Sequence, residues 1–221
     1  MCSSTGVWGR SGSDEMSRNV FYLAMGAILS WGFVLTMLVA KSTADWHPGL
    51  GMLLLVGLGV PIIGICLSAF SSNALVSFAG FNMVVGGLSA ILGPVLAMYA
   101  LKQPGLIERA ATFTGLVTAV MGISGMLFPN FYRHIGGVLF GALMALVVVS
   151  FARMFIPAIQ GVGIIDYMSA VIFSLYIGYD MWRASEIPAT LDNAVDVAVS
   201  LYLDIINLFL DLLRILGSSD D

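Results

Sequence analysis

A row of polar side chains runs along the last apolar segment of the chain, "AVDVAVSLYLDIINLFLDLLRILG". The row consists of Asp196, Ser200, Asp204, Asn207, Asp211 and Arg214. Successive members are 4, 4, 3, 4 and 3 residues apart, which is the repeat of a single helix face. Carboxyl and amide oxygens aligned in this way can exchange protons and attract cations. The spacing therefore predicts an ion path lined by one helix.

The energetic cost of these groups indicates where the helix lies. An aspartate at the centre of a membrane helix costs about 2.5–3.5 kcal/mol. Asp204 and Asp211 share one segment, so together they offset much of its hydrophobic gain. Membrane helices carry such residues mainly where they pair, take up a proton or border an aqueous cavity. We therefore expect this segment to be central and surrounded by the other helices.

Several of the polar residues also have a purely structural interpretation. Asp211 and Arg214 are three residues apart and can pair on one helix. Asn207 can hydrogen-bond a neighbouring helix. Asp196, and Asp166 in the preceding segment, lie near segment ends, where they can be solvated or can cap a helix. These readings remain open beside the ion path.

A second acid of interest, Asp180 in "SLYIGYDMWRA", lies near the end of the preceding segment, with Arg183 three residues later. Asp204, by contrast, has no Lys or Arg three or four residues away, which favours a functional role for it. A turn at Pro188 would leave Asp180 and Asp204 offset by several residues along antiparallel helices. Helix tilt can close that gap, so the spacing permits contact without requiring it.

The elements that position these residues follow from the composition. The chain is 59% hydrophobic and 10% charged, whereas soluble domains carry about 25% charged residues. A bilayer core of about 30 Å needs roughly 20 apolar residues in a helix. Such segments are predicted at 20–40, 50–70, 74–100, 107–128, 135–156, 161–183 and 193–216. The prediction is an all-α membrane protein, a seven-transmembrane-helix bundle at 19–217 with the last helix central. A disordered tail is expected at 1–18 and a short acidic tail at 218–221.

Other functional classes find no support in the residues. No basic run exists that would bind nucleic acid. The two cysteines, Cys2 and Cys66, and the two histidines, His47 and His134, lack the spacing of a disulfide framework or a metal site. No nucleophile–base set stands out, so neither an enzyme nor a tightly held cofactor is expected. A proton-coupled transporter would be expected to show an internal duplication, and none is evident.

The strings "SLYIGYDMWRA" and "SLYLDIINLFLDLLRILG" resemble the transmembrane Bax inhibitor motif family in its short bacterial form, over about residues 19–217. The resemblance implies a seven-helix bundle with the last helix in the middle. It also implies a pH-sensitive calcium leak channel, as the better-understood bacterial members are described. Asp180 and Asp204, 24 residues apart, match the family's di-aspartyl pair, which shares a proton in a closed state and becomes repulsive when the proton leaves.

The resemblance assigns further roles and leaves one gap. Calcium is the expected permeant ion, since it favours carboxylate and carbonyl oxygens, and it is not expected as a held cofactor. The ion path or its supporting polar stripe would comprise Asn207, Asp211, Asp196 and Ser200. The family's latch arginine in an early span has no counterpart in "GLGMLLLVGLGVPIIGICLSAF". A latch would therefore come from Arg183 or Arg214, or be missing.

The expected setting is an integral membrane protein of the bacterial inner membrane, in contact with the lipid bilayer, calcium and protons. An alternative function is a non-conducting regulatory partner of another membrane protein, such as a protease or stress-response complex. That alternative needs no ion path, and its acidic stripe would be buried in a dry protein interior.

Overall fold

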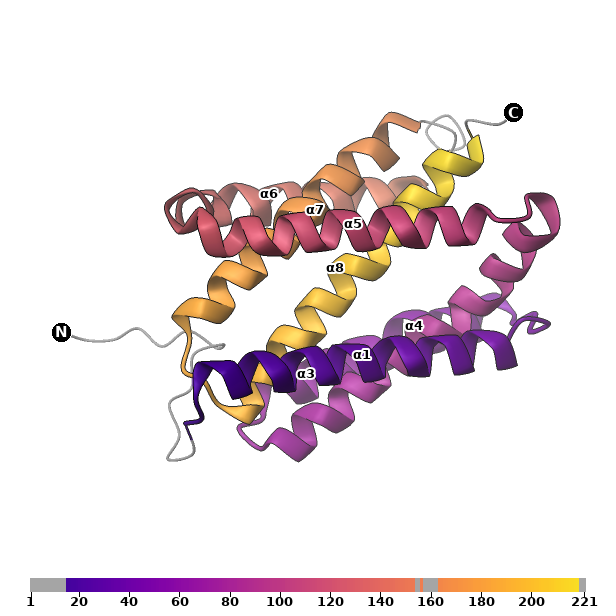
Figure 1. Ribbon diagram of the computed structural model, residues 1–221. Helices are drawn as coiled ribbons and strands as arrows, with labels where there is room; N and C mark the ends of the chain where they lie inside the picture. Colours follow the sequence, from indigo (N-terminus) through magenta and orange to yellow (C-terminus); the bar gives the residue numbers. More distant parts are fainter. Residues whose placement is uncertain (1–14, 154–155, 157–162, 219–221) are drawn as a thin grey trace. The chain divides into compact units, whose positions relative to one another are not determined.

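A computed structural model describes residues 15–153, 156 and 163–218, and this part of the chain forms helices and no strands (Figure 1). The predicted all-α class is confirmed. The contacts divide the chain into two compact units. Unit 1 comprises Met1–Lys102 and Glu186–Tyr202, and unit 2 comprises Gln103–Ser185 and Leu203–Asp221.

Unit 1 is built from nearly the first half of the chain and the beginning of the last helix. It contains α1 (Arg18–Ser42), α2 (Leu50–Leu54), the π-helical turn η1 (Leu55–Gly59), α3 (Val60–Phe70), α4 (Ala74–Lys102) and the first part of α8 (Leu191–Ser218). Because α2, η1 and α3 follow one another without a break, they form one helical segment, Leu50–Phe70. Unit 2 contains α5 (Leu106–Leu127), α6 (Pro129–Arg153), nearly all of α7 (Gly163–Glu186) and the rest of α8.

Local chemistry explains where several helices begin. Ser17 caps α1, since its side-chain oxygen accepts a hydrogen bond from the backbone N–H of Val20 at 3.4 Å. Gly105 precedes α5 with a φ of 84°, a left-handed conformation that suits glycine. Pro61 is the second residue of α3, two residues after the end of the π-helical turn, and its ring suits the first turn of a helix. Pro94 lies inside α4, which continues through it.

Glycines bring helices into close contact within each unit. In unit 1 a side chain on Gly64 of α3 would overlap the carbonyl oxygen of Gly80 in α4, and the reverse also holds. In unit 2 a side chain on Gly125 of α5 would overlap the backbone of Gly178 in α7. Close packing through small residues is the usual way in which membrane helices associate. The contacts of Gly64 with Gly80 and of Gly125 with Gly178 are of this kind.

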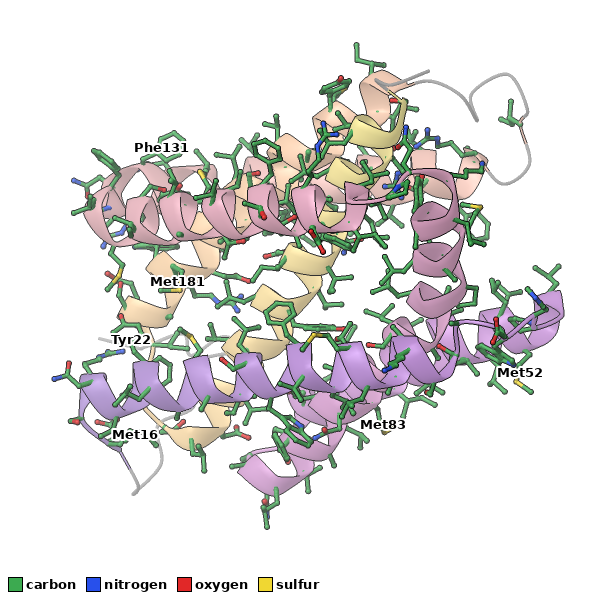
Figure 2. The ribbon with its side chains drawn as sticks, turned by 45° about the vertical axis from the view of Figure 1, so that its right-hand side comes forward. Met16, Tyr22, Met52, Met83, Phe131 and Met181 are labelled. Carbon is green, nitrogen blue, oxygen red and sulfur yellow. The ribbon has the colours of Figure 1, made fainter. Side chains whose placement is uncertain are left out.

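In the part of the chain that the structure describes, five helical segments are long and apolar enough to cross a membrane. They are α1, Leu50–Phe70, α4, α5 and α6. Large apolar side chains are exposed on them, among them Met52 and Phe131, which are about half exposed (Figure 2). Such surfaces suit contact with lipid. Helices α7 and α8 are 24 and 28 residues long but carry most of the buried acids.

The predicted segments and the observed helices agree closely, with one clear difference. The fifth segment was expected to begin at residue 135, whereas α6 begins at Pro129, because proline suits the first turn of a helix. The fifth segment was predicted to end at 156 and the sixth to begin at 161. Residues 154–155 and 157–162 lie outside the described residues, as do residues 1–14 and 219–221 of the two predicted tails. Seven membrane spans, a central last helix and disordered tails stay predictions.

Candidate functional site

The carboxyl groups of Asp180 in α7 and Asp204 in α8 lie within hydrogen-bonding reach of each other, and both residues belong to unit 2. Both residues are buried, at 3% and 7% exposure. An ionised carboxylate can only accept hydrogen bonds, so a bond between two carboxyls requires a proton on one of them. The contact that the spacing permitted is therefore made, and the sharing of one proton by the two acids stays a prediction.

A positive charge lies beside this pair. The Nη2 atom of Arg183 is 3.5 Å from Oδ1 of Asp180, three residues earlier on α7. Two carboxyls with one shared proton carry a charge of −1, which the guanidinium offsets. Loss of the proton would leave one uncompensated negative charge in a buried site, at a large cost in free energy. The arrangement can thus convert the loss of a proton into an electrostatic force between α7 and α8.

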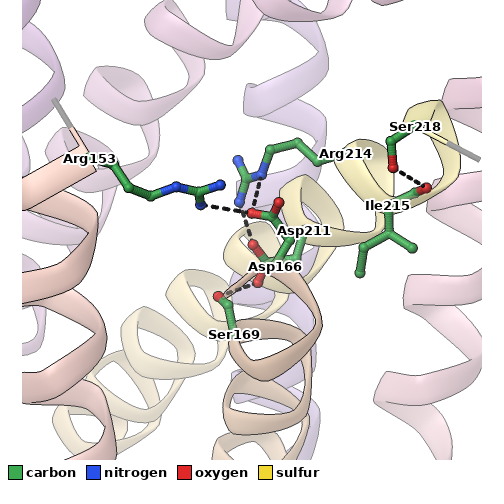
Figure 3. Close-up of polar contacts among 7 residues, drawn as sticks. All are labelled: Arg153, Asp166, Ser169, Asp211, Arg214, Ile215 and Ser218. Atoms are coloured by element: carbon green, nitrogen blue, oxygen red, sulfur yellow. Dashed lines mark hydrogen bonds and ion pairs between the residues drawn. The ribbon is translucent and has the colours of Figure 1, made fainter. Parts of the chain in front are cut away.

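A second group of charges lies near the other end of α7, also in unit 2 (Figure 3). This charge cluster consists of Arg153, Asp166, Ser169, Asp211 and Arg214. Oδ1 of Asp166 accepts hydrogen bonds from Arg153 Nη1 and Arg214 Nε, each at 3.0 Å. Asp211 accepts from Arg214 Nη2 through one oxygen and from the Ser169 hydroxyl through the other. The cluster thereby joins α6, α7 and α8.

The structure corrects one interpretation and agrees with another. Asp166 was read as solvated or capping, but it is 8% exposed and forms ion pairs with two arginines. The ion pair of Asp211 with Arg214 on one helix is present. Sequence reasoning missed Arg153, which was left without a role. The sequence did contain a signal for this ion pair. Arg153 ends α6 and Asp166 lies in the first turn of α7, so two opposite charges are close in sequence where one helix ends and the next begins.

The first part of α8 makes separate polar contacts in unit 1. Asp196 accepts a hydrogen bond from the hydroxyl of Ser68 in α3. One turn earlier, Asp192 accepts from the hydroxyl of Ser77 in α4 at 2.6 Å. Both aspartates are buried. Asp196 was also read as solvated or capping, and it is instead a buried link between α8 and α3.

The phenol of Tyr202 is a further polar contact of α8 in unit 1. Its oxygen lies 2.8 Å from the hydroxyl of Thr36 in α1 and 3.3 Å from that of Ser89 in α4. Tyr202 is fully buried, so these hydroxyls satisfy one another away from water. Sequence reasoning did not single out this residue, because a tyrosine in an apolar segment carries no spacing signal.

Two members of the polar stripe bond within α8 itself. The Ser200 hydroxyl donates to the Asp196 carbonyl at 3.3 Å, and the Asn207 amide donates to the Leu203 carbonyl at 2.7 Å. The structural interpretation of Asn207 expected a hydrogen bond to a neighbouring helix. The bond that its amide donates stays instead within α8. The predicted roles of these residues in an ion path stay predictions.

Comparison with known sequences identifies one matching family and several similar proteins. The sequence model of the family described as "Inhibitor of apoptosis-promoting Bax1" matches residues 14–221. An uncharacterized protein of Helicobacter pylori is 34% identical over 155 residues, which cover 70% of this chain and 63% of the relative. An uncharacterized membrane protein of Vibrio cholerae is 27% identical over 214 residues, covering 93% of this chain and 90% of the relative. A BI1-like protein of Arabidopsis thaliana is 41% identical over 91 residues, or 41% of this chain and 35% of that protein.

Proposed function

The chain belongs to the Bax inhibitor family, as the resemblance predicted, and from this premise we propose that it is a proton-regulated cation leak channel with calcium as the permeant ion. In this proposal α7 and α8 are the sixth and seventh membrane spans, and α8 is central. The near-complete burial of α8 from Asp192 to Val199 supports that place for it.

The observation that carries the proposal is the close approach of the buried carboxyls of Asp180 and Asp204. With one shared proton the pair attracts and α7 and α8 stay together. When the proton leaves, two carboxylates face each other in a site that water does not screen, and they repel. A repulsive force at one point of a packed helix pair is a sufficient bias for a two-state gate. Flux should therefore rise as the pH rises through the range in which the pair loses its proton.

Calcium flux into liposomes that contain the protein, followed with an enclosed calcium indicator across a pH series, tests the proposal. We expect flux above that of empty vesicles, with a pH response that both Asp180→Asn and Asp204→Asn abolish. The matched control is Asp45→Asn, which removes an exposed acid between α1 and α2 and should leave the response unchanged. No flux at any pH would end the proposal, and an unaltered pH response in both variants would remove the pair as the sensor.

A second candidate is a non-conducting regulatory partner of another membrane protein. The observation in its favour is that Asp196 and Asp211 in the polar stripe both accept hydrogen bonds from serine hydroxyls of neighbouring helices, as a dry interior requires. Co-purification of one stoichiometric membrane protein, together with an absence of flux, would support this candidate over the channel.

We further propose that the protein resides in the inner membrane of a bacterium. The five helical segments able to cross a membrane and the likeness to a membrane protein of Vibrio cholerae support this location. Separation of inner and outer membranes on a density gradient tests it. Recovery in the outer-membrane fraction would contradict it.

A further inference from the structure

Arg214 occupies an unusual position in the charge cluster, because one guanidinium serves two helices. Its Nε atom donates to Asp166 of α7, and its Nη2 atom donates to Asp211 of its own helix, α8 (Figure 3). Asp166 in turn accepts from Arg153, the last residue of α6. The charges alternate in sign from Arg153 to Asp211 and sum to zero. A chain of contacts therefore runs from the end of α6 through the first turn of α7 to the last third of α8.

The acids of the cluster depend on these arginines. Asp166 and Asp211 are 8% and 1% exposed, so water cannot replace a lost partner. Removing one member of a buried ion pair leaves an uncompensated charge, which is far more costly than the pair itself is favourable. The helix ends add to the attraction, because Arg153 lies at a carboxyl terminus and Asp166 in the first turn of a helix. The cluster is consequently a strong link among three helices.

The cluster differs from the ion pair of Arg183 with Asp180, which joins two residues of the same helix. A contact within one helix does not resist the separation of two helices, whereas the Arg214 contact with Asp166 must break if α7 and α8 part. The Arg214 side chain is 43% exposed, so it can leave its partners for water without crossing the protein interior. A release step is therefore sterically open.

We propose that the charge cluster is an ion-pair clamp, centred on Arg214, that holds the ends of α6, α7 and α8 together and opposes their separation. Its effect on flux rests on the proposed channel function, but its effect on the helices does not. The clamp acts beside the proton-sharing pair: Asp180 and Asp204 set the force that drives the helices apart, and the clamp sets the force that must be overcome.

A distance measurement tests the clamp without reference to conduction. Nitroxide labels are attached at Ile164→Cys in α7 and Ser218→Cys in α8, both exposed positions, in a background in which Cys2 and Cys66 are replaced by serine. We expect a narrow distance distribution by electron–electron double resonance in the otherwise unaltered protein. In Arg214→Gln the distribution should broaden toward longer distances, and Arg214→Lys, which keeps the charge, should show a smaller change.

Graded variants sharpen the test. Arg153→Gln removes one contact of Asp166 but leaves the bridge of Arg214, so it should widen the distribution less than Arg214→Gln. Lys102→Gln, which removes one positive charge at the exposed end of α4, is the matched control and should change nothing. An unchanged distribution in Arg214→Gln would overturn the clamp. If Arg214→Gln does not insert into the membrane, the same distance measurement on Arg153→Gln tests the clamp. An unchanged distance distribution in Arg153→Gln would then overturn the clamp.

Calcium flux then connects the clamp to the gate. At the pH at which the unaltered protein leaks least, Arg214→Gln should raise the flux about tenfold, the change expected from losing one charged hydrogen bond that favours the closed state. If the distance between α7 and α8 increases in Arg214→Gln but no protein conducts calcium, the clamp is supported and the channel is refuted. Flux in the unaltered protein with no change of distance or flux in Arg214→Gln would refute the clamp and leave the channel standing.

Discussion

Replacement of Arg183 by glutamine should move the pH response of the leak. The guanidinium lies 3.5 Å from an oxygen of Asp180, and the pair of Asp180 and Asp204 is buried beside it. With the arginine present, loss of the shared proton leaves a net charge of −1 on the three groups together. Without it, the same step leaves −2. The pair in Arg183→Gln should therefore release its proton only at a higher pH.

The magnitude follows from the distance. Two unit charges 3.5 Å apart interact by about 5 kcal/mol at an effective dielectric constant of about 20. Since one pH unit corresponds to about 1.4 kcal/mol, this interaction sets an upper bound of about 3.5 pH units on the shift. Glutamine can still donate a hydrogen bond to Asp180, which recovers part of the interaction. We expect the pH of half-maximal flux in Arg183→Gln to rise by about 1–3 units.

The assay is calcium entry into liposomes across a pH series, with the unaltered protein and Arg183→Lys measured in parallel. Lysine keeps the charge, so its half-maximal pH should stay within about half a unit of the original. Equal elution profiles and equal thermal stability in detergent would establish that all three proteins are folded. A half-maximal pH that does not move, or that falls, in Arg183→Gln would refute the reasoning.

Three further predictions concern stability in detergent, measured by thermal unfolding. Asp196→Ala should destabilise the protein by about 1–3 kcal/mol, because the buried hydroxyl of Ser68 loses its acceptor. Asp196→Asn keeps an acceptor oxygen and should restore most of the lost stability. An unchanged melting temperature in the alanine variant would contradict this prediction. Tyr202→Phe loses two hydroxyl contacts and should cost about 1 kcal/mol, since such bonds between membrane helices average about 0.6 kcal/mol each; a gain in stability would refute it. Gly178→Ala should destabilise by about 1–3 kcal/mol through overlap with a neighbouring aromatic ring, whereas Gly137→Ala, which faces open space, should be neutral or stabilising; equal effects would disprove the packing argument.

The helices could be predicted from the sequence because each depends on a long run of apolar residues and on local breaks. The link at Pro188 and the turn at 71–73 are both where the sequence predicts them. The start of α6 was misplaced because a proline that interrupts one helix can equally begin the next. The choice between these two roles is made by the neighbouring backbone, which periodicity does not describe.

The candidate site could be predicted only in part, for a physical reason. The helical repeat of the last segment identifies which residues share a face, but not which partners they meet. Asp166 shows the limit: its fate depends on Arg153 and Arg214, which reach it from two other helices. Contact between Asp180 and Asp204 likewise depends on helix tilt and crossing, which residue counting leaves open.

The contact of Gly178 with α5 has a consequence for how the gate can move. Gly178 lies two residues before Asp180, and it touches the backbone at Gly125 and the ring of Tyr132. Because Gly125 and Gly178 have no side chains, the backbones of α5 and α7 meet directly at this point, and no change of rotamer can relieve the contact. Helix α7 is thus anchored next to the acid it contributes, so we expect it to act as the fixed wall of the gate. In the proposed channel, α8 would then be the helix that moves, and Asp204 would be the member of the pair that departs.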